Sequence, residues 1–345
     1  MKTVYVIGAG ASYEANLPTG DMLKGEIATL LNMKFNHHEQ TSGDYEIQQS
    51  LRLHTEEDRT FNSLNEYLRE CRHISENMPL AISIDNFIDS QRENDKLALC
   101  GKLAITKSIL KAEKGSKLFF DRNNGQRTLN FSSLEKTWYL LFFRTITENC
   151  SVEDLLLRFQ NITLIIFNYD RCVEHFLLQA LTSYYRLSQD AAASIISNLT
   201  IIHPYGTVGA LSWLNPKRSV AIEFGGELHV SQLVAYANGI RTFTEGAHSE
   251  SMEILEANMK NAERLVFLGF AFHRLNMNLL RGSSNGYDSE NAIKCIATAF
   301  EMSKSDRDSI AESIQYLYNC PVYVHIENST CNKIFKDYSR SLGFS

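Results

Sequence analysis

Short apolar runs alternate along the chain with longer segments in which apolar residues recur every three or four positions. The runs are rich in Val and Ile and contain few polar residues, which is typical of parallel strands covered on both faces. We predict strands at 3–7, 162–167, 199–202, 264–269, 292–298 and 321–326. We predict helices among and after the later strands at 170–186, 188–197, 249–262, 303–318 and 331–341. This alternation predicts an α/β fold, a Rossmann-like doubly wound parallel sheet.

The first two predicted strands lie about 150 residues apart, far more than a single crossover requires. Apolar residues at helical spacing predict helices in this stretch at 20–33, 60–71, 83–91, 95–114 and 131–146. The polar segments 35–58 and 114–130 are predicted loops. We therefore expect one domain in which a helical subdomain, about 35–149, is inserted into a Rossmann-like lobe formed by 1–34 and 150–345.

Composition limits the classes of function. The 345 residues carry a net charge of −6, so a broad nucleic-acid-binding surface is not expected. No apolar run approaches the roughly 18 residues of a membrane span, and the N-terminal run is too short for a signal peptide, so we expect a cytoplasmic protein. None of the seven cysteines stands in a Cys-x-x-Cys pair, which argues against a structural zinc site. We expect reduced cysteines and no metal.

Small and polar residues follow four of the predicted strands directly. These segments are 8–12 (GAGAS), 168–170 (NYD), 203–206 (HPYG) and 269–276 (GFAFHRLN). Ligands of doubly wound sheets bind beyond the carboxyl ends of the strands, so four such segments on one edge predict a nucleotide-binding cleft.

Each of these segments also has a simpler interpretation. Gly-x-Gly after a strand lets the backbone approach a pyrophosphate, but it also suits a tight turn. Asp170 suits either the stabilisation of positive charge or the capping of the helix that follows it. His203 suits either general base catalysis or a structural role. The third glycine of the dinucleotide fingerprint is absent, since position 13 is Tyr, and this disfavours a dehydrogenase.

Taken together, "GAGAS" (8–12), "FNYD" (167–170), "IIHPYG" (201–206) and "LVFLGFAF" (265–272) resemble the motifs of the sirtuin-like NAD-consuming family in order and spacing. "SIDNF" (83–87) is similar to a helical motif of bacterial members. The resemblance implies that NAD+ binds as substrate between a large Rossmann-type lobe and a smaller helical lobe. The residues it implies to be catalytic are Asn168 and His203, and it implies that Asp170 and the loop from Gly269 contact the ribose rings. The reaction itself makes Asp170 a third predicted catalytic residue. Those it implies to bind NAD+ are Gly8, Ala9, Gly10, Ala11, Ser12, Asp21, Gly269, Phe270, His273 and Asn276.

The chemistry expected of such a site follows from the leaving group. Nicotinamide leaves NAD+ as a neutral molecule, so its departure requires no general acid. We expect Asn168 to position a water or a ribose hydroxyl and Asp170 to stabilise an oxocarbenium-like ribose. We expect neutral His203 to take a proton from water, directly or through a ribose hydroxyl.

The chain lacks the four-cysteine zinc module of protein-deacylating sirtuins, and it carries "HPYG" (203–206) where these enzymes place a His-Gly stretch. It is more similar to the zinc-free bacterial branch, whose members are typically NAD+ hydrolases of antiphage defence. The resemblance implies an NAD+ glycohydrolase that depletes NAD+ and forms a homo-oligomer, partnered with a HerA-type ATPase or another sensor. Two alternatives stay open: a non-catalytic sensor that binds NAD+ or ADP-ribose and controls a partner, and an NAD+-dependent protein deacylase.

Overall fold

The computed structural model describes residues 1–37, 39–57, 63–121, 125, 128–214, 221–247, 251–282 and 285–344. Its central feature is a sheet of six parallel strands. The strands are β1 (Thr3–Ile7), β4 (Ile162–Ile166), β5 (Thr200–Ile202), β6 (Arg264–Leu268), β7 (Ile293–Thr298) and β8 (Val322–Glu327). All six predicted strands are confirmed, and each end lies within one residue of its predicted position.

The order of the strands is β5-β4-β1-β6-β7-β8. Along the chain, β4 and β5 extend the sheet to one side of β1, whereas β6, β7 and β8 extend it to the other side. The direction therefore reverses between β1 and β6, which confirms a Rossmann-like doubly wound sheet. Ligands of such sheets bind beyond the carboxyl ends of the strands at this reversal.

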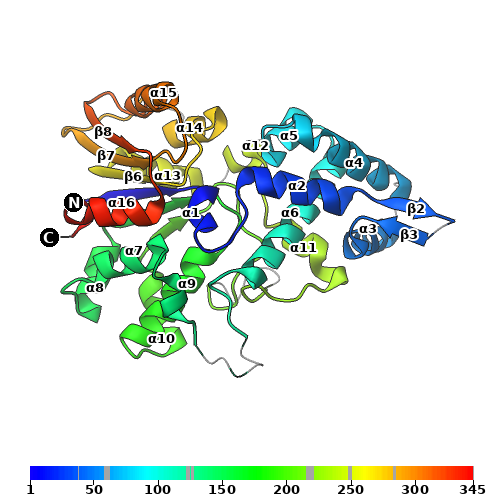
Figure 1. Cartoon of the computed structure of the whole chain (residues 1–345), viewed down its shortest axis with the longest axis horizontal. Coiled ribbons are helices and arrows are strands. Elements are labelled where there is room, and N and C mark those ends of the chain that lie inside the picture. The colour runs from blue at the N-terminus through cyan, green and yellow to red at the C-terminus, as the bar shows by residue number, and fades with distance from the viewer. Residues whose placement is uncertain are drawn as a thin grey trace.

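Helices cover both faces of the sheet (Figure 1). Side chains alternate along β1, so that Val4 and Val6 belong to one core while Tyr5 and Ile7 belong to the other. The first core is covered by α13 (Ser251–Lys260), α14 (Arg274–Arg281) and α15 (Lys304–Gln315). The second is covered by α7 (Trp138–Thr147), α8 (Val152–Phe159), α9 (Cys172–Tyr184), α10 (Gln189–Ile196), α16 (Cys331–Asp337) and α17 (Ser339–Leu342).

A second group of helices lies on the right of Figure 1, away from the sheet. This helical group contains α2 (Gly20–Leu31), α3 (Tyr45–Glu57), α4 (Leu64–Asn77), the 3-10 turn η1 (Met78–Leu80), α5 (Ile84–Ser90), α6 (Asp95–Gly115), α11 (Leu233–Ala237) and α12 (Phe243–Ala247). Within it, α2 packs on α4 and α6, and α11 packs on α3 and α6. The helical group therefore draws on segments that precede and follow the predicted insert, whose boundaries stay a prediction.

The prediction that 35–58 is a loop is wrong. Much of this segment forms the antiparallel pair β2 (Lys34–Asn36) and β3 (Glu39–Ser42), followed by α3. In α3, Ile47 and Leu51 are buried whereas Tyr45 and Leu53 are exposed. Two buried apolar positions in a mostly polar segment give only a weak helical periodicity, which explains the error.

The single helix predicted at 131–146 is divided. It begins with the 3-10 turn η3 (Phe131–Leu134), and α7 starts only at Trp138. The Thr137 hydroxyl donates to Leu134 O (2.7 Å), and the Trp138 N–H donates to the Glu14 carboxylate (2.7 Å). A partner far away in the sequence therefore starts α7, and the local pattern does not reveal it.

The helix α8 is not among the predicted helices, although Ser151 and Asp154 form the capping box that starts it. Parts of the predicted helices 60–71 and 249–262 and of the predicted loop 114–130 lie outside the described residues.

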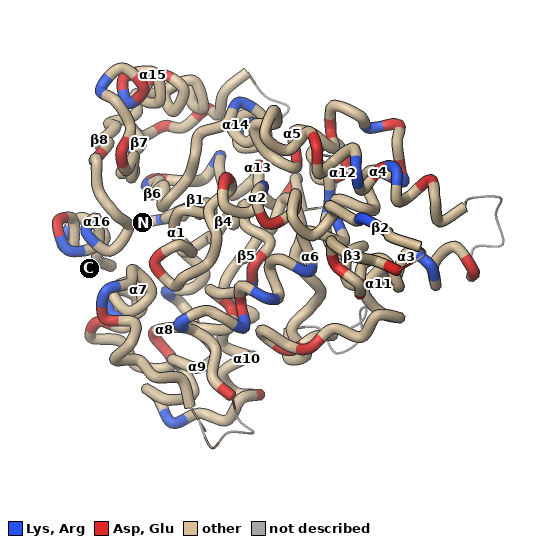
Figure 2. Tube along the Cα trace, turned by 45° about the vertical axis from the view of Figure 1, so that its right-hand side comes forward, with Lys and Arg blue, Asp and Glu red and all other residues tan. Residues whose placement is uncertain are grey.

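Within the described ranges, no helix combines the length and apolar character needed to cross a membrane. Basic and acidic residues are distributed over both the sheet lobe and the helical group (Figure 2).

Candidate functional site

The loops that leave β1 and β6 pack directly against each other at the reversal of strand order. The Gly10 N–H donates to Gly269 O (3.0 Å). A Cβ on Gly8 would lie 2.6 Å from Gly269 O. Gly269 has a φ of +56°, and a Cβ there would lie 2.0 Å from Ala11 N. The close approach of two backbones therefore requires these glycines without any ligand, which supports the interpretation of this segment as a tight turn.

A hydrogen-bonded network joins the ends of β1 and β4. Asn168 Nδ2 donates to Gly8 O (3.1 Å) and to Ser12 Oγ (2.9 Å). The Ser12 hydroxyl donates to Asp170 Oδ2 (2.9 Å). The other carboxylate oxygen of Asp170 accepts the N–H of Cys172 (3.1 Å), the first residue of α9. Asp170 thus binds the first N–H of α9 from the position before its N-cap, Arg171, and belongs to the network at the same time.

His203, directly after β5, extends this network to a third strand. Its Nδ1 lies 3.1 Å from Asn168 O, and its Nε2 lies 2.7 Å from Glu174 Oε1. Glu174 belongs to the first turn of α9, and its side chain is 4% exposed. We call Ser12, Asn168, Asp170, Glu174 and His203 the strand-exit cluster.

Burial and neighbouring charges shift the pKa values of two members of the strand-exit cluster. Burial raises the pKa of Asp170 although hydrogen bonds from Cys172 and Ser12 oppose this, and the Glu113 carboxylate adds to the rise. Burial alone would lower the pKa of His203, but the Glu174 carboxylate reverses this and the net shift is upward. Asp170 is therefore harder to ionise, and His203 is easier to protonate, than either group would be in water.

Several buried oxygens in this region make no hydrogen bond with any described residue, and three of them belong to the loop after β4 or the start of α9. They are Asn168 Oδ1, Glu174 Oε2 and the Tyr169 hydroxyl. An unpaired buried polar atom costs about 1–3 kcal/mol, so such atoms often lie where a water or a ligand completes a site. The Asn168 amide oxygen is therefore suited to accept a hydrogen bond from a water or a substrate hydroxyl.

The other predicted NAD+-binding residues near the cluster have different environments. Asn276 Oδ1 accepts the Tyr205 hydroxyl (2.6 Å), a bond that links the ends of β5 and β6. Phe270 is buried, and its ring centroid lies 5.0 Å from that of Phe167. Phe270 thus packs within the core. Ala9 is half-buried at the start of the short helix α1 (Ala9–Tyr13).

Asp21 and His273 lie near each other. Asp21 is exposed and pairs with Lys24 (2.9 Å). Partial burial lowers the pKa of His273, and the Asp21 carboxylate opposes this shift. No hydrogen bond or ion pair between described residues joins either side chain to the cluster. Hydrogen bonds therefore connect the three predicted catalytic residues with Ser12, but not with Asp21 or His273.

The helical group reaches the same edge of the sheet through α5 and α6. Burial raises the pKa of Tyr205, and the Asp85 and Asp89 carboxyls of α5 raise it further. Loss of contact with water raises the pKa of Asp85 itself to about 7. From the end of α6, Glu113 forms a buried ion pair with Arg171, directly before α9. The loops after β4 and β5 therefore meet both lobes.

Sequence reasoning missed three contributors to this site: Glu174, Trp138 and the Glu113–Arg171 pair. The Trp138 indole N–H donates to Ala11 O (3.0 Å) and so fixes α1 from α7. Glu174 had a signal in the sequence, because it is an acidic residue in the first turn of a predicted helix. Trp138 and Glu113 had no such signal, since their contacts join residues 127 and 58 positions apart.

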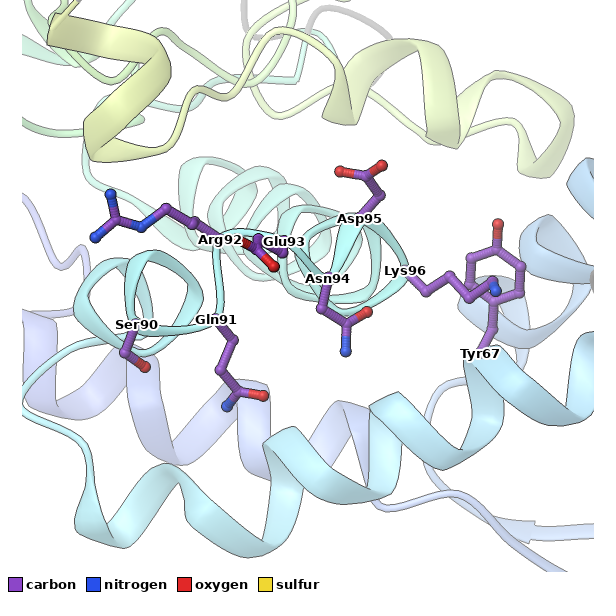
Figure 3. A pocket seen from close by; sticks show the side chains of 8 residues that line it. All are labelled: Tyr67, Ser90, Gln91, Arg92, Glu93, Asn94, Asp95 and Lys96. Atoms are coloured by element: carbon purple, nitrogen blue, oxygen red, sulfur yellow. The ribbon is translucent and has the colours of Figure 1, made fainter.

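Two cavities in the described part of the chain lie elsewhere. One, of about 860 Å³, is lined by Tyr67 and residues 90–96 at the turn between α5 and α6. Figure 3 shows its Gln91 and Asn94 pointing toward α4, where their side chains lie 3.3 Å from His73 Nε2 and 3.1 Å from Glu70 Oε2. The other, of about 550 Å³, is lined by α7, α9 and α16. Neither contains a predicted site residue, and the described residues hold no group of three or more potential metal ligands.

Comparison with known proteins adds no further assignment. No protein-family model matches the chain, and no curated protein matches it either. The strand-exit cluster and its position in the fold are therefore the features of the structure that bear on function.

Proposed function

We propose that this chain is an NAD+ glycohydrolase, which cleaves the bond between nicotinamide and ribose and releases nicotinamide and ADP-ribose. The observation that carries the proposal is the connection of Ser12, Asn168, Asp170 and His203 by hydrogen bonds at the ends of three adjacent strands. These strands adjoin the reversal of strand order, where doubly wound sheets bind nucleotides. The resemblance of the same segments to sirtuin-like NAD-consuming enzymes supports the proposal independently of the geometry.

The cluster contains the groups that the reaction requires. The unpaired Asn168 amide oxygen is suited to hold the attacking water or a ribose hydroxyl. The Asp170 carboxylate, when ionised, is suited to stabilise the positive charge that develops on the ribose. His203 is the only member whose ordinary pKa lies near neutral pH, so it is suited to carry the proton released by the attacking water.

One observation favours a second function, that of a sensor that binds NAD+ or ADP-ribose without cleaving it. Both nitrogens of His203 and both oxygens of Asp170 already have partners within the chain. A site in which the catalytic groups are occupied by each other suits binding or a resting state. Saturable NAD+ binding without nicotinamide release would favour the sensor.

The wider assignments rest on the resemblance alone. They are a role in antiphage defence, a homo-oligomer and a partner such as a HerA-type ATPase, whereas a cytoplasmic location is proposed from the composition of the chain. Sedimentation of the purified chain tests the oligomer, and NAD+ turnover with and without the product of a neighbouring gene tests the partner. A deacylase would release nicotinamide only in proportion to the acetyl-peptide consumed.

Nicotinamide release from NAD+ by the purified chain tests the proposal. We expect Asn168→Ala to reduce the release by about 10²-fold or more, as expected when a positioned polar group is removed from a catalytic site. Asn161→Ala is the matched control, because Asn161 is exposed and lies at the opposite end of β4. Equal release by wild type and Asn168→Ala would contradict the proposal.

A further inference from the structure

The His203 ring has an acceptor at each of its nitrogens. Asn168 O is a backbone carbonyl and can only accept a hydrogen bond, so Nδ1 must carry a hydrogen. An ionised Glu174 carboxylate likewise only accepts, so in this state Nε2 also carries a hydrogen in the 2.7 Å contact. The arrangement therefore corresponds to a charged imidazolium paired with a carboxylate.

The surroundings favour this charge pair. The side chains of His203 and Glu174 are 11% and 4% exposed, and buried charges are stable only when they are paired. A second carboxyl, Asp170, also faces His203 from the loop after β4, and the Cys172 thiol lies beside Glu174 on α9. The place of Glu174 in the first turn of α9 suits a negative charge, because the helix dipole is positive there.

While it is paired with Glu174 in its charged form, His203 cannot act as a base. A doubly protonated ring has no lone pair, so His203 cannot accept a proton while Glu174 holds it in the charged form. We propose that Glu174 is a positioning residue for NAD+ cleavage, which orients His203 and sets the pH above which His203 becomes a base. Above that pH, the Nε2 proton leaves to solvent and the ring no longer donates to Glu174 Oε1. The attacking water or a ribose hydroxyl then takes the place of that oxygen beside Nε2, and the freed lone pair takes its proton.

The first test measures the ring itself and does not depend on turnover. Histidine labelled with ¹³C at Cε1 gives one NMR signal for each of the ten histidines, and His203→Gln assigns the signal of His203 by its loss. We expect the pKa of His203 to be lower in Glu174→Gln than in the wild type. Glu174→Asp, which keeps the charge but withdraws it by one methylene, should give a value between the two.

A matched control separates this effect from a general loss of negative charge. Glu153 is an exposed acidic residue in the first turn of α8, so Glu153→Gln should leave the titration of His203 unchanged. An unchanged pKa of His203 in both Glu174 variants would overturn the proposal. If Glu174→Gln does not fold, as judged by circular dichroism, the titration of Glu174→Asp decides in the same way.

The second test concerns kinetics, and this arm rests on the proposed NAD+ glycohydrolase function. Since His203 must lose its proton to act as a base, the acid limb of the pH profile of kcat should move to lower pH in Glu174→Gln. On the alkaline plateau, where His203 is neutral in both proteins, kcat should be lower in Glu174→Gln by about tenfold or more, because a less basic and less well oriented imidazole is a weaker base. Nicotinamide release with an unmoved acid limb would overturn the role of Glu174 while the proposed function stands. An absence of release from the wild type would overturn the proposed function, whereas the NMR titration would still decide the pairing.

Discussion

The Glu113–Arg171 pair permits a prediction about stability that can be worked out from its contacts. Glu113 is wholly buried, and Arg171 is 1% exposed. Glu113 Oε1 accepts hydrogen bonds from Arg171 N and Nε (both 3.1 Å). Glu113 Oε2 accepts from Arg171 Nη2 (2.5 Å) and from the Gly225 N–H (3.0 Å). One carboxylate thus joins α6, the start of α9 and the segment around Gly225.

Glu113→Gln removes the charge with little change of shape. It leaves Arg171 as a buried cation without its counter-charge, and breaking a buried pair in this way costs about 3–5 kcal/mol. Arg171 keeps its bonds to Ile222 O (2.6 Å) and Glu223 O (3.2 Å), so we expect the lower end of this range, about 3 kcal/mol.

Urea unfolding followed by circular dichroism measures this loss. Glu227→Gln is the matched control, because the side chains of Glu227 and its partner Lys114 are 85% and 52% exposed. We expect the control to change the free energy of unfolding by less than about 0.5 kcal/mol. A loss below about 1 kcal/mol in Glu113→Gln would refute the reasoning that this pair holds the three segments together.

Two further predictions concern the loops of the site. Gly269→Ala places a Cβ 2.0 Å from Ala11 N at a φ of +56°, so we expect the free energy of unfolding to fall by more than about 2 kcal/mol. Gly25→Ala, in α2 with nothing within 4 Å, should instead raise it by about 0.5–1 kcal/mol, and equal stability of the two variants would contradict the packing described. Burial raises the pKa of Asp170 above its ordinary 3.8, so the folded chain binds this proton more readily than the unfolded chain does. The wild type therefore loses stability as pH rises above about 3.8, and the stability of Asp170→Asn relative to wild type should increase with pH from there. The exposed Asp190→Asn should show no such increase in urea titrations, and a pH-independent difference for Asp170→Asn would count against the burial argument.

The sheet could be predicted from the sequence because its signal is local. Each strand is a run of apolar residues covered on both faces, and Tyr5 and Val6 of β1 are fully buried although they face different cores. The sequence also predicts that Asn168, Asp170 and His203 meet, because each follows a strand and the carboxyl ends of parallel strands share one edge of the sheet. The sequence does not specify the hydrogen bond of Ser12 to Asp170, which joins residues 158 positions apart.

The rest of the site depends on contacts between distant segments. The sequence shows Glu113 as one acidic residue near the end of a helix, and only folding brings it to Arg171. The glycines at 8 and 10 suggest a phosphate-binding turn, which stays a prediction, and only folding shows that their backbone packs against Gly269. The helix α3 escaped prediction because it buries only one narrow apolar stripe containing Ile47 and Leu51.

The mass of the ADP-ribose formed when the purified chain is incubated with NAD+ in ¹⁸O-labelled water tests NAD+ hydrolysis directly. We expect nicotinamide and ADP-ribose in equal amounts, with one solvent oxygen in each ADP-ribose, and the loss of both products in Asn168→Ala. Intact NAD+ after incubation with the folded wild type, or the same labelled product from Asn168→Ala, would contradict this expectation.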